Sequence, residues 1–371
     1  MLTPTDFFDQ IEAVLQSKRP FVLFSKPGQP SIKSYIQLDS ESYTINDFSE
    51  SGFVFAPFDH HKDRYYIPTN KSSLIEIETA DFKISTPTNT SNTTNDSIHH
   101  IELVSKAIEE IKSSDLEKVV VSRAFQFTLE ASNPIEIFKN LYQKYPMAFT
   151  YCWFHPETGF WFGASPERLL KLEGKSVSTM SLAGTQYYDA SKEIIWDDKN
   201  CKEHAFVTDY LLDVLKDYLD GIKSVGSSTL RAGELLHLQT SITGRLKPSK
   251  EALKDLIHAL HPTPAVCGTP RAMALDFINT NETYDREYYT GFFGELNISD
   301  TSTFRNSKKN IENRAYHTNR KSTDLAVNLR CMKLINSTAI LYSGGGITKD
   351  SDPNQECIEI HNKIQTVKSI L

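Results

Sequence analysis

Apolar residues recur along this chain at two different spacings, and each spacing predicts a different kind of element. Between residues 101 and 111 they lie three or four positions apart, which predicts a helix over residues 98–114. A similar stripe between Phe206 and Tyr218 predicts a second helix, and we expect Gly221 to end it. Both helices should therefore bury one face and expose the other.

Short runs rich in β-branched and aromatic residues make up much of the rest of the chain. A first strand is predicted at Lys118–Arg123. Glu173-Gly174 and Asn336-Ser337 are typical turns between antiparallel neighbours. Short connections of this kind, mixed with helices, predict an α+β fold. The further predicted strands are Phe149–Phe154, Phe160–Phe162, Leu169–Leu172, Val177–Ser181, Asp324–Met332 and Ala339–Ser343.

The beginning of the chain differs from the remainder. The first eighty residues carry short apolar runs broken by proline and glycine, and a tract rich in serine, threonine and asparagine follows at residues 85–97. Such a tract is typical of an exposed connection. The sequence thus divides into a portion covering residues 1–97 and a region covering residues 98–371.

Composition and charge limit the class of protein. The chain has 371 residues, a formal charge of −7 and five widely spaced cysteines. The negative charge argues against general nucleic-acid binding or an anionic membrane surface, so an anionic ligand needs a local cationic site. No apolar stretch approaches the roughly twenty residues of a membrane span, and the first residues lack a signal-peptide pattern. We therefore expect a cytoplasmic protein whose thiols are reduced.

The most informative segment, residues 341–363, is predicted to form a strand, a triple-glycine turn and a helix. Asp352 suits the N-cap of that helix. At about 100° per residue, Glu356, Glu359 and Lys363 share one helix face. Two carboxylates and an amine then point at one place, although a solvated charged face is the alternative.

Glu203 lies near the start of the helix predicted around Phe206. A glutamate there can compensate the helix dipole, or it can bind a metal. A hard cation such as Mg²⁺ takes few carboxylates and keeps positions open for water and substrate oxygens, and Glu203 with Glu359 would supply such ligands. His204 is expected to be a packing residue, because no partner lies at zinc spacing.

Two further side chains have patterns that suit proton transfer. Glu167 follows Pro166 in a predicted turn between two apolar strands. Burial there would raise its pKa and suit it to donate a proton, whereas a surface turn is the alternative. Lys118 precedes three valines and is either a strand-edge gatekeeper or a desolvated amine.

Two glycine turns are weak signals by themselves. Ala183–Thr185 offers backbone N–H groups and a hydroxyl to a carboxylate, whereas Gly291–Gly294 lacks the βαβ context of a phosphate loop. The sequence contains no hydrolase elbow, no zinc-binding H-E-x-x-H and no C-x-x-C pair. The common sequence patterns of hydrolases and zinc sites are therefore absent.

Taken in order, these segments resemble the chorismate-utilising enzyme family, which contains isochorismate, salicylate, anthranilate and aminodeoxychorismate synthases. The resemblance spans roughly residues 98–371, and residues 1–97 fit as the family's variable N-terminal portion. Its blocks are Lys118–Arg123, Gly163–Arg168, Leu182–Thr185, Glu203-His204, His237–Gly244, Leu260–Gly268, Arg286–Gly291, Leu329–Cys331 and Gly344–Lys363.

The resemblance implies a single α+β domain in which two antiparallel sheets, with helices outside, hold chorismate and Mg²⁺ in a cleft. It implies Glu203 and Glu359 as direct metal ligands, with Glu356 holding metal-bound water. Asn200 departs from the acidic residue that many relatives have at this position. The residues implied to bind the substrate are Gly184, Thr185, His237, Thr263, Tyr289, Arg330, Gly344, Gly346 and Lys363.

Two positions distinguish branches of the family. Amine-adding members typically have glutamine where Lys118 stands, and aminodeoxychorismate synthases have lysine where Ala183 stands, so the resemblance implies addition of water. By analogy, uncharged Lys118 deprotonates water for attack at C2, and protonated Glu167 donates to the departing C4 hydroxyl. The product would be isochorismate, which feeds menaquinone, siderophore or salicylate synthesis in this family.

Two alternatives accompany this interpretation. A salicylate synthase forms the same intermediate and then eliminates pyruvate, and the segments His237–Gly244 and Leu260–Gly268 lie near that chemistry in the family. A protein of another class would bind Mg²⁺ and an organic acid on the same scaffold without turnover. We expect a monomer, because a complete cleft needs no partner chain.

Overall fold

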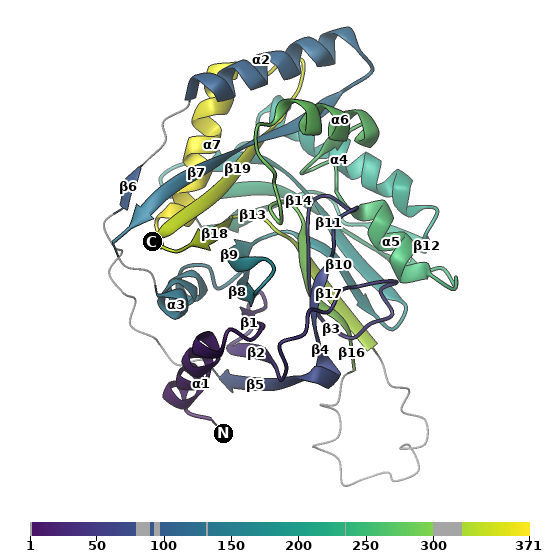
Figure 1. The fold of residues 1–371 in the computed structure, drawn as a ribbon. Helices are drawn as coiled ribbons and strands as arrows, with labels where there is room; N and C mark the ends of the chain where they lie inside the picture. Colours follow the sequence, from purple (N-terminus) through teal and green to yellow (C-terminus); the bar gives the residue numbers. More distant parts are fainter. Residues whose placement is uncertain (1, 79–89, 93–96, 131–132, 234, 300–320) are drawn as a thin grey trace.

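Two antiparallel β-sheets with helices on their outer faces make up the structure (Figure 1). It is a computed structural model that describes residues 2–78, 90–92, 97–130, 133–233, 235–299 and 321–371. The α+β class predicted from the short antiparallel connections is confirmed, as are the two sheets that the family resemblance implies.

The first sheet has the strand order β15-β7-β19-β18-β9-β8-β1-β2-β5, with β6 beside β7. Its strands are β1 Phe21–Ser25, β2 Ser31–Gln37, β5 Ser72–Glu78, β6 Thr90–Asn92, β7 Lys118–Leu129, β8 Phe149–His155, β9 Gly159–Ser165, β15 Gly268–Thr269, β18 Cys331–Ile335 and β19 Thr338–Ile347.

The second sheet has the strand order β12-β14-β11-β10-β17-β16-β3-β4, with β13 beside β14. Its strands are β3 Gly52–Ala56, β4 Tyr65–Pro68, β10 Arg168–Glu173, β11 Ser176–Tyr187, β12 Leu219–Ser224, β13 Ser228–Ala232, β14 Leu235–Leu246, β16 Phe292–Ser299 and β17 Lys321–Val327. The helices are α1 Pro4–Ser17, α2 Ser97–Ser113, α3 Pro134–Lys144, α4 Asp198–Leu215, α5 Ala252–Leu260, α6 Arg271–Asn281 and α7 Pro353–Lys368.

Aromatic side chains fill the space between the two sheets. Phe55 of β3 stacks on Trp153 of β8 with ring centroids 5.0 Å apart, and on Tyr288 at 4.5 Å. Stacked rings of this kind stabilise a core beyond the area they bury. On the outer faces, α1, α3 and α7 pack against the first sheet, and α4 and α5 pack against the second.

Residues 1–97 are built into both sheets. β1 pairs with β8, β3 pairs with β16, and α1 covers the first sheet. In the tract predicted as an exposed connection, residues 85–89 and 93–96 lie outside the described residues. Residues 90–92 differ from that prediction, because they form β6 on the edge of β7.

The helix predicted over residues 98–114 is confirmed as α2, and α4 carries the Phe206 stripe. The prediction that Gly221 ends α4 is wrong, since the helix ends at Leu215 and Gly221 lies within β12. The helix ends in a tightened turn of the 3-10 type. In it, the backbone N–H groups of residues 216–218 each donate to the carbonyl three residues earlier.

The run Asp324–Met332, predicted as one strand, is divided between the two sheets. β17 belongs to the second sheet and β18 to the first. Between them, Asn328 accepts a hydrogen bond from the Tyr151 hydroxyl at 2.7 Å and donates one to the Tyr288 carbonyl at 2.8 Å. These buried bonds turn the chain, and Arg330 adopts a φ of 48°. The single-strand prediction is wrong because partners distant in sequence fix this turn.

All five cysteines are free thiols, and only Cys201 is exposed. In the described part of the chain, no helix combines the length and the apolar character that crossing a membrane requires.

A buried ion pair ties β7 to the segment that follows α6. Arg286 donates to both carboxylate oxygens of Glu282, at 2.8 and 2.6 Å. The same guanidinium donates to the carbonyl of Val120 in β7 at 2.7 Å and to that of Val266 at 3.0 Å. Both charged side chains are only 2% exposed, so water cannot replace a lost partner.

Removing one partner of this pair should destabilise the protein strongly. Glu282→Ala leaves the Arg286 guanidinium buried without a counter-charge, and we expect the free energy of unfolding to fall by about 3–5 kcal/mol. Urea denaturation followed by circular dichroism measures this. Asp213→Ala breaks the exposed pair with Lys216 and should leave the transition nearly unchanged. Equal effects of the two variants would contradict the role given to the buried pair.

Candidate active site

A cavity of about 330 Å³ lies beside the first turns of α4 and α7. Its walls come from these helices, from β11 and β19, and from the segments around Val266 and Arg330. The predicted site residues that line it are Glu167, Gly184, Thr185, Glu203, His237, Tyr289, Arg330, Gly344, Gly346, Glu356, Glu359 and Lys363.

The triple-glycine segment lies at the end of β19, where it pairs with β7. A Cβ on Gly346 would lie 2.8 Å from Cε of Lys118 and 2.9 Å from Oε1 of Glu203, so no side chain fits there. A Cβ on Gly345 would lie 3.4 Å from Oε2 of Glu356. Gly346 thus allows the Glu203 carboxylate of α4 to approach β19, whereas the contact of Glu356 with Gly345 is an ordinary one.

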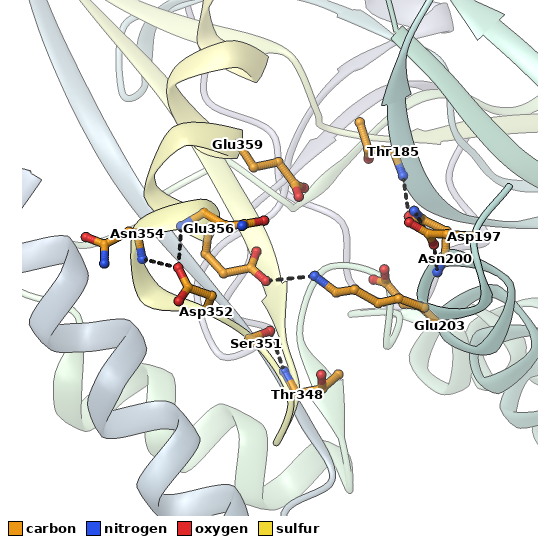
Figure 2. A network of polar contacts seen from close by, with 12 residues as sticks. Thr185, Asp197, Asn200, Glu203, Thr348, Ser351, Asp352, Asn354, Glu356 and Glu359 are labelled. Carbon is orange, nitrogen blue, oxygen red and sulfur yellow. Dashed lines mark hydrogen bonds and ion pairs between the residues drawn. The ribbon is translucent and has the colours of Figure 1, made fainter. Parts of the chain in front are cut away.

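The N-terminus of α7 is capped as predicted. The Asp352 carboxylate accepts hydrogen bonds from the backbone N–H groups of Asn354 and Gln355 at 3.0 and 2.9 Å (Figure 2). Pro353 occupies the first helical position, where its missing N–H costs nothing. This cap fixes the start of the helix, and Glu356 and Glu359 consequently face the cavity.

Three lysine–glutamate ion pairs lie in or against the cavity; five of their six residues line it, and Lys118 lies behind Gly346. Each glutamate that the sequence predicts to bind the metal is paired with the ammonium group of a lysine. The pairs are Lys118–Glu203 at 2.9 Å, Lys199–Glu356 at 3.1 Å and Lys363–Glu359 at 2.6 Å.

Burial and these partners act in opposite directions on the carboxyl groups. Burial alone would raise the pKa of Glu203, but Lys118, Lys363 and Lys199 together outweigh it and the pKa is lowered. Burial and the neighbouring Glu359 raise the pKa of Glu356 despite the nearby Lys199. Burial would lower the pKa of Lys363, but its carboxylate neighbours raise it instead.

Lys118 is a buried residue, only 3% exposed, on a strand with neighbours on both sides. β15 pairs with one edge of β7 at this position, and β19 pairs along the other. The strand-edge gatekeeper alternative is therefore wrong. The amine instead reaches Glu203 on α4, from which it is separated by 85 residues of sequence.

Glu167 lies in the predicted turn between β9 and β10 and is 4% exposed, so the surface-turn alternative is wrong. The Ser165 hydroxyl fixes this turn, because it donates to the Val327 carbonyl at 2.6 Å and accepts from the Glu167 N–H at 3.3 Å. Burial raises the pKa of Glu167 to about 8, although Lys118 acts in the opposite direction. At neutral pH the carboxyl group is mostly protonated, as a proton donor requires.

His237 holds Arg330 in place. Arg330 donates to Nε2 of His237 at 2.6 Å and to the Ala232 carbonyl at 3.0 Å. Nδ1 of His237 therefore carries the ring proton and donates it to the Gly184 carbonyl at 2.9 Å. Burial, together with Arg330, lowers the pKa of His237 to about 3, so the ring is neutral. Burial lowers the pKa of Arg330 to about 10, which leaves it charged at neutral pH.

Gly344 is the meeting point of two further predicted residues. Its carbonyl accepts a hydrogen bond from Lys363 at 3.2 Å. A Cβ on Gly344 would lie 2.9 Å from the Tyr289 hydroxyl, so that hydroxyl lies directly over the glycine. Thr263 is different: it is buried in the loop after α5 and does not line the cavity, although Val266 three residues later does.

Sequence reasoning missed Lys199. The signal was available, because Lys199 precedes Glu203 by four residues and a four-residue spacing places two side chains on one helix face. The lysine also reaches Glu356 on α7, and no spacing along one helix predicts that contact.

Residues 58–305 and 316–371 match the model of a protein family described as chorismate binding enzyme. The chain belongs to the chorismate-binding enzyme family. The resemblance found from the sequence blocks is thereby confirmed.

The match between this chorismate-binding enzyme and its named relatives covers only part of each relative. Isochorismate synthase MenF of Escherichia coli (strain K12) is 29% identical over 283 residues, covering 73% of this chain and 59% of that protein. Anthranilate synthase component 1 of Saccharolobus solfataricus is 24% identical over 332 residues, covering 85% and 71%. The chain thus spans less than two thirds of the length of the MenF proteins of Escherichia coli and Bacillus subtilis, which it covers by 59% and 55%.

Solved structures share the fold of this chorismate-binding enzyme. A structure titled putative 2,3-dihydroxybenzoate-specific isochorismate synthase, DhbC, from Bacillus anthracis has a TM-score of 0.76 and 22% identity, with 97% of this chain and 98% of that chain covered. MenF from Escherichia coli, titled menaquinone-specific isochorismate synthase, has a TM-score of 0.77 and 21% identity, with 95% and 88% covered. The two-sheet fold is therefore the family's.

The cavity of this chorismate-binding enzyme is lined by the carboxylates of Glu203, Glu356 and Glu359. Carboxylate oxygens are the ligands that Mg²⁺ prefers. Figure 2 shows the three carboxylates directed into the space between α4 and α7. Among the described residues, only residues 59–61 bring three acidic, His or Cys ligand atoms within 4.8 Å of one another, and they lie outside the cavity. The three glutamates therefore lie farther apart as a set than this limit, and each is paired with a lysine. Their chemistry fits a divalent ion that takes two carboxylates directly and keeps water elsewhere.

The raised pKa of Glu167 makes stability depend on pH. The pKa rises from 4.5 to about 8, so between these values the folded state holds a proton that the unfolded state has lost. The contribution of this group to stability should therefore fall as pH rises through that window and then level off. Glu167→Gln removes the titration, and its stability relative to the wild type should increase from about pH 4.5 to about pH 8.

Urea denaturation at several pH values across that window measures the effect. Glu12→Gln, at an exposed position of α1, is the matched control and should show no such trend. A stability difference for Glu167→Gln that stays constant with pH would contradict the buried, protonated carboxyl group.

Proposed function

We propose that this protein converts chorismate to isochorismate by adding water at C2 of the ring while the C4 hydroxyl departs. The observation that carries the proposal is that buried, mostly protonated Glu167 lines the cavity, while buried Lys118 lies behind Gly346 of its wall and close enough to act on the pKa of Glu167. Family membership and relatives named isochorismate synthase support it. The menaquinone-specific and 2,3-dihydroxybenzoate-specific names of solved relatives suggest two uses for such a product.

Three cationic side chains line the cavity beside Asp197 and three ion-paired glutamates, and they give a substrate with two carboxylates its possible partners. Arg330, Lys199 and Lys363 contribute positive charge in a protein whose net charge is −7. Arg330 is held rigidly by His237, so its remaining N–H groups are preorganised for a planar carboxylate. We infer that Tyr289, over Gly344, and Lys363 bind the second carboxylate.

Two proton transfers accompany the proposed reaction. Lys118 must first give up the proton that it holds in the ion pair with Glu203, and the uncharged amine then takes a proton from the water that attacks C2. Glu167 gives its proton to the C4 oxygen, which leaves as water. One water enters and one leaves, so the substrate is isomerised without any change in composition. Lys118 ends protonated and Glu167 ends ionised, and exchange with solvent restores both.

The carboxylates of Glu203 and Glu359 would hold Mg²⁺ directly, and Glu356 would hold a metal-bound water. When bound, the ion supplies fixed positive charge for the ring carboxylate of the substrate. One chain contributes all the residues named in this site, which supports the proposal of a functional monomer.

Incubation of the purified protein with chorismate and Mg²⁺, followed by chromatographic product analysis, tests the proposal. Isochorismate without pyruvate is the expected result. Steady release of pyruvate with salicylate would replace the proposal with a salicylate synthase. Binding of chorismate without any product would favour the non-catalytic alternative.

Loss of the proposed base should separate binding from turnover. Lys118→Ala removes the proton acceptor, and we expect turnover to fall by about 10²–10⁴-fold while the dissociation constant of chorismate changes little. Stopped assays and equilibrium binding measure the two quantities. Lys216→Ala, at an exposed lysine just after α4, is the control and should behave like the wild type. If turnover survives in Lys118→Ala, another group is the base.

Loss of a proposed metal ligand should be visible without any reaction. Glu359→Gln removes one negative ligand, and we expect the dissociation constant of Mg²⁺ to rise at least about tenfold. Isothermal titration of Mg²⁺ into substrate-free protein measures this. Glu251→Gln breaks only the pair with Lys254 in α5 and is the matched control. Identical Mg²⁺ titrations of Glu359→Gln and wild type would exclude Glu359 as a ligand.

A further inference from the structure

The turn Gly184–Thr185 is held against α4 by a single side chain. β11 leaves its register with β14 between Ala183 and Gln186, so the sheet ladder does not engage the Thr185 N–H. That N–H instead donates to Oδ1 of Asn200 in the first turn of α4, at 3.0 Å (Figure 2). The approach is close, because a Cβ on Gly184 would lie 3.1 Å from the same oxygen.

The other half of the Asn200 carboxamide is also engaged. Its Nδ2 group donates to Oδ1 of Asp197 at 2.8 Å, and Asp197 in turn caps α4 by accepting the Asn200 backbone N–H at 2.7 Å. One end of the side chain must therefore accept a hydrogen bond while the other end donates one. A carboxylate has no proton to donate at neutral pH, so asparagine fits this position and an acidic residue does not.

Hydrogen bonds connect the turn Gly184–Thr185 to Arg330 through His237. The Gly184 carbonyl accepts the Nδ1 proton of His237, and Nε2 of His237 accepts from Arg330. Asn200 thus stands at the head of a continuous series of hydrogen bonds that ends at the guanidinium proposed to bind substrate. Three residues farther along the same helix is Glu203, the proposed metal ligand.

We propose that Asn200 is a positioning residue that couples the metal-binding turn of α4 to the anion-binding turn Gly184–Thr185. The identity of the substrate in this proposal rests on the proposed function. The coupling through Asn200 is a property of the folded chain and does not depend on that function. By holding the Thr185 N–H, Asn200 keeps that amide from a substrate carboxylate. The Thr185 hydroxyl, 3.4 Å from Nδ1 of His237, and Arg330 then remain as the groups that face the carboxylate. The neutral amide of Asn200 also keeps another negative charge away from Asp197 and from a dianionic ligand.

Two variants of Asn200 separate the role of its Oδ1 acceptor from the roles of its Nδ2 donor and its lack of charge. Asn200→Ala removes both hydrogen bonds. Asn200→Asp keeps a similar shape and an acceptor for Thr185, but it loses the donor and places a carboxylate against Asp197. Cys201→Asp is the matched control, since it adds a carboxylate to the same helix turn at an exposed position without reaching Thr185.

Hydrogen–deuterium exchange of the peptide that contains Thr185 tests the coupling without any reaction. In Asn200→Ala we expect the Thr185 amide to exchange about five- to tenfold faster, as the loss of one hydrogen bond implies. In Cys201→Asp the exchange should match the wild type. Unchanged exchange in Asn200→Ala would overturn the proposal, whether or not the wild-type protein makes isochorismate.

Steady-state kinetics with chorismate and a Mg²⁺ titration distinguish positioning from a general structural role. We expect KM to rise about tenfold in Asn200→Ala and further in Asn200→Asp, with kcat within about threefold of wild type. A fall in kcat with KM unchanged would overturn the proposal. Absence of isochorismate from the wild type would instead refute the proposed function, and the exchange result would then decide the coupling alone.

Discussion

Three lysines and three glutamates lie in or against the walls of one cavity, and the attraction between them constrains which ligands can bind there. Charges taken out of water need partners, and here each carboxylate has an ammonium group within about 3 Å. The formal charges of the six groups cancel. A divalent cation and a dianion together would add no net charge to this set, whereas either alone would leave an imbalance. The proposed combination of Mg²⁺ and a dicarboxylate therefore matches the electrostatics of the site.

Local pattern was sufficient to predict the elements that carry these charges. The apolar stripe in α2, the Asp352 cap of α7 and the turns at Glu173-Gly174 and Asn336-Ser337 depend on neighbours within a few residues. Glu356, Glu359 and Lys363 share a face because helix geometry requires it. For the same reason, the shared face of Lys199 and Glu203 could have been found from their spacing.

The remainder of the site depends on contacts between distant segments. Sequence alone could not decide whether Lys118 was an exposed gatekeeper or a buried amine, because its partner Glu203 comes from another element. The crossing at Asn328 depends on hydrogen bonds to Tyr151 and Tyr288, so a run of β-formers was mistaken for one strand. Asn200 likewise gains its role only where β11 leaves its register beside α4.

The central claim is that a buried acid and a buried amine add water to one face of a ring and release a hydroxyl from another position. Reaction of chorismate with the protein and Mg²⁺ in ¹⁸O-labelled water, followed by mass spectrometry of the product, tests it most directly. The account predicts isochorismate that carries one ¹⁸O, located in the C2 hydroxyl. Isochorismate whose C2 hydroxyl carries only unlabelled oxygen would contradict the account.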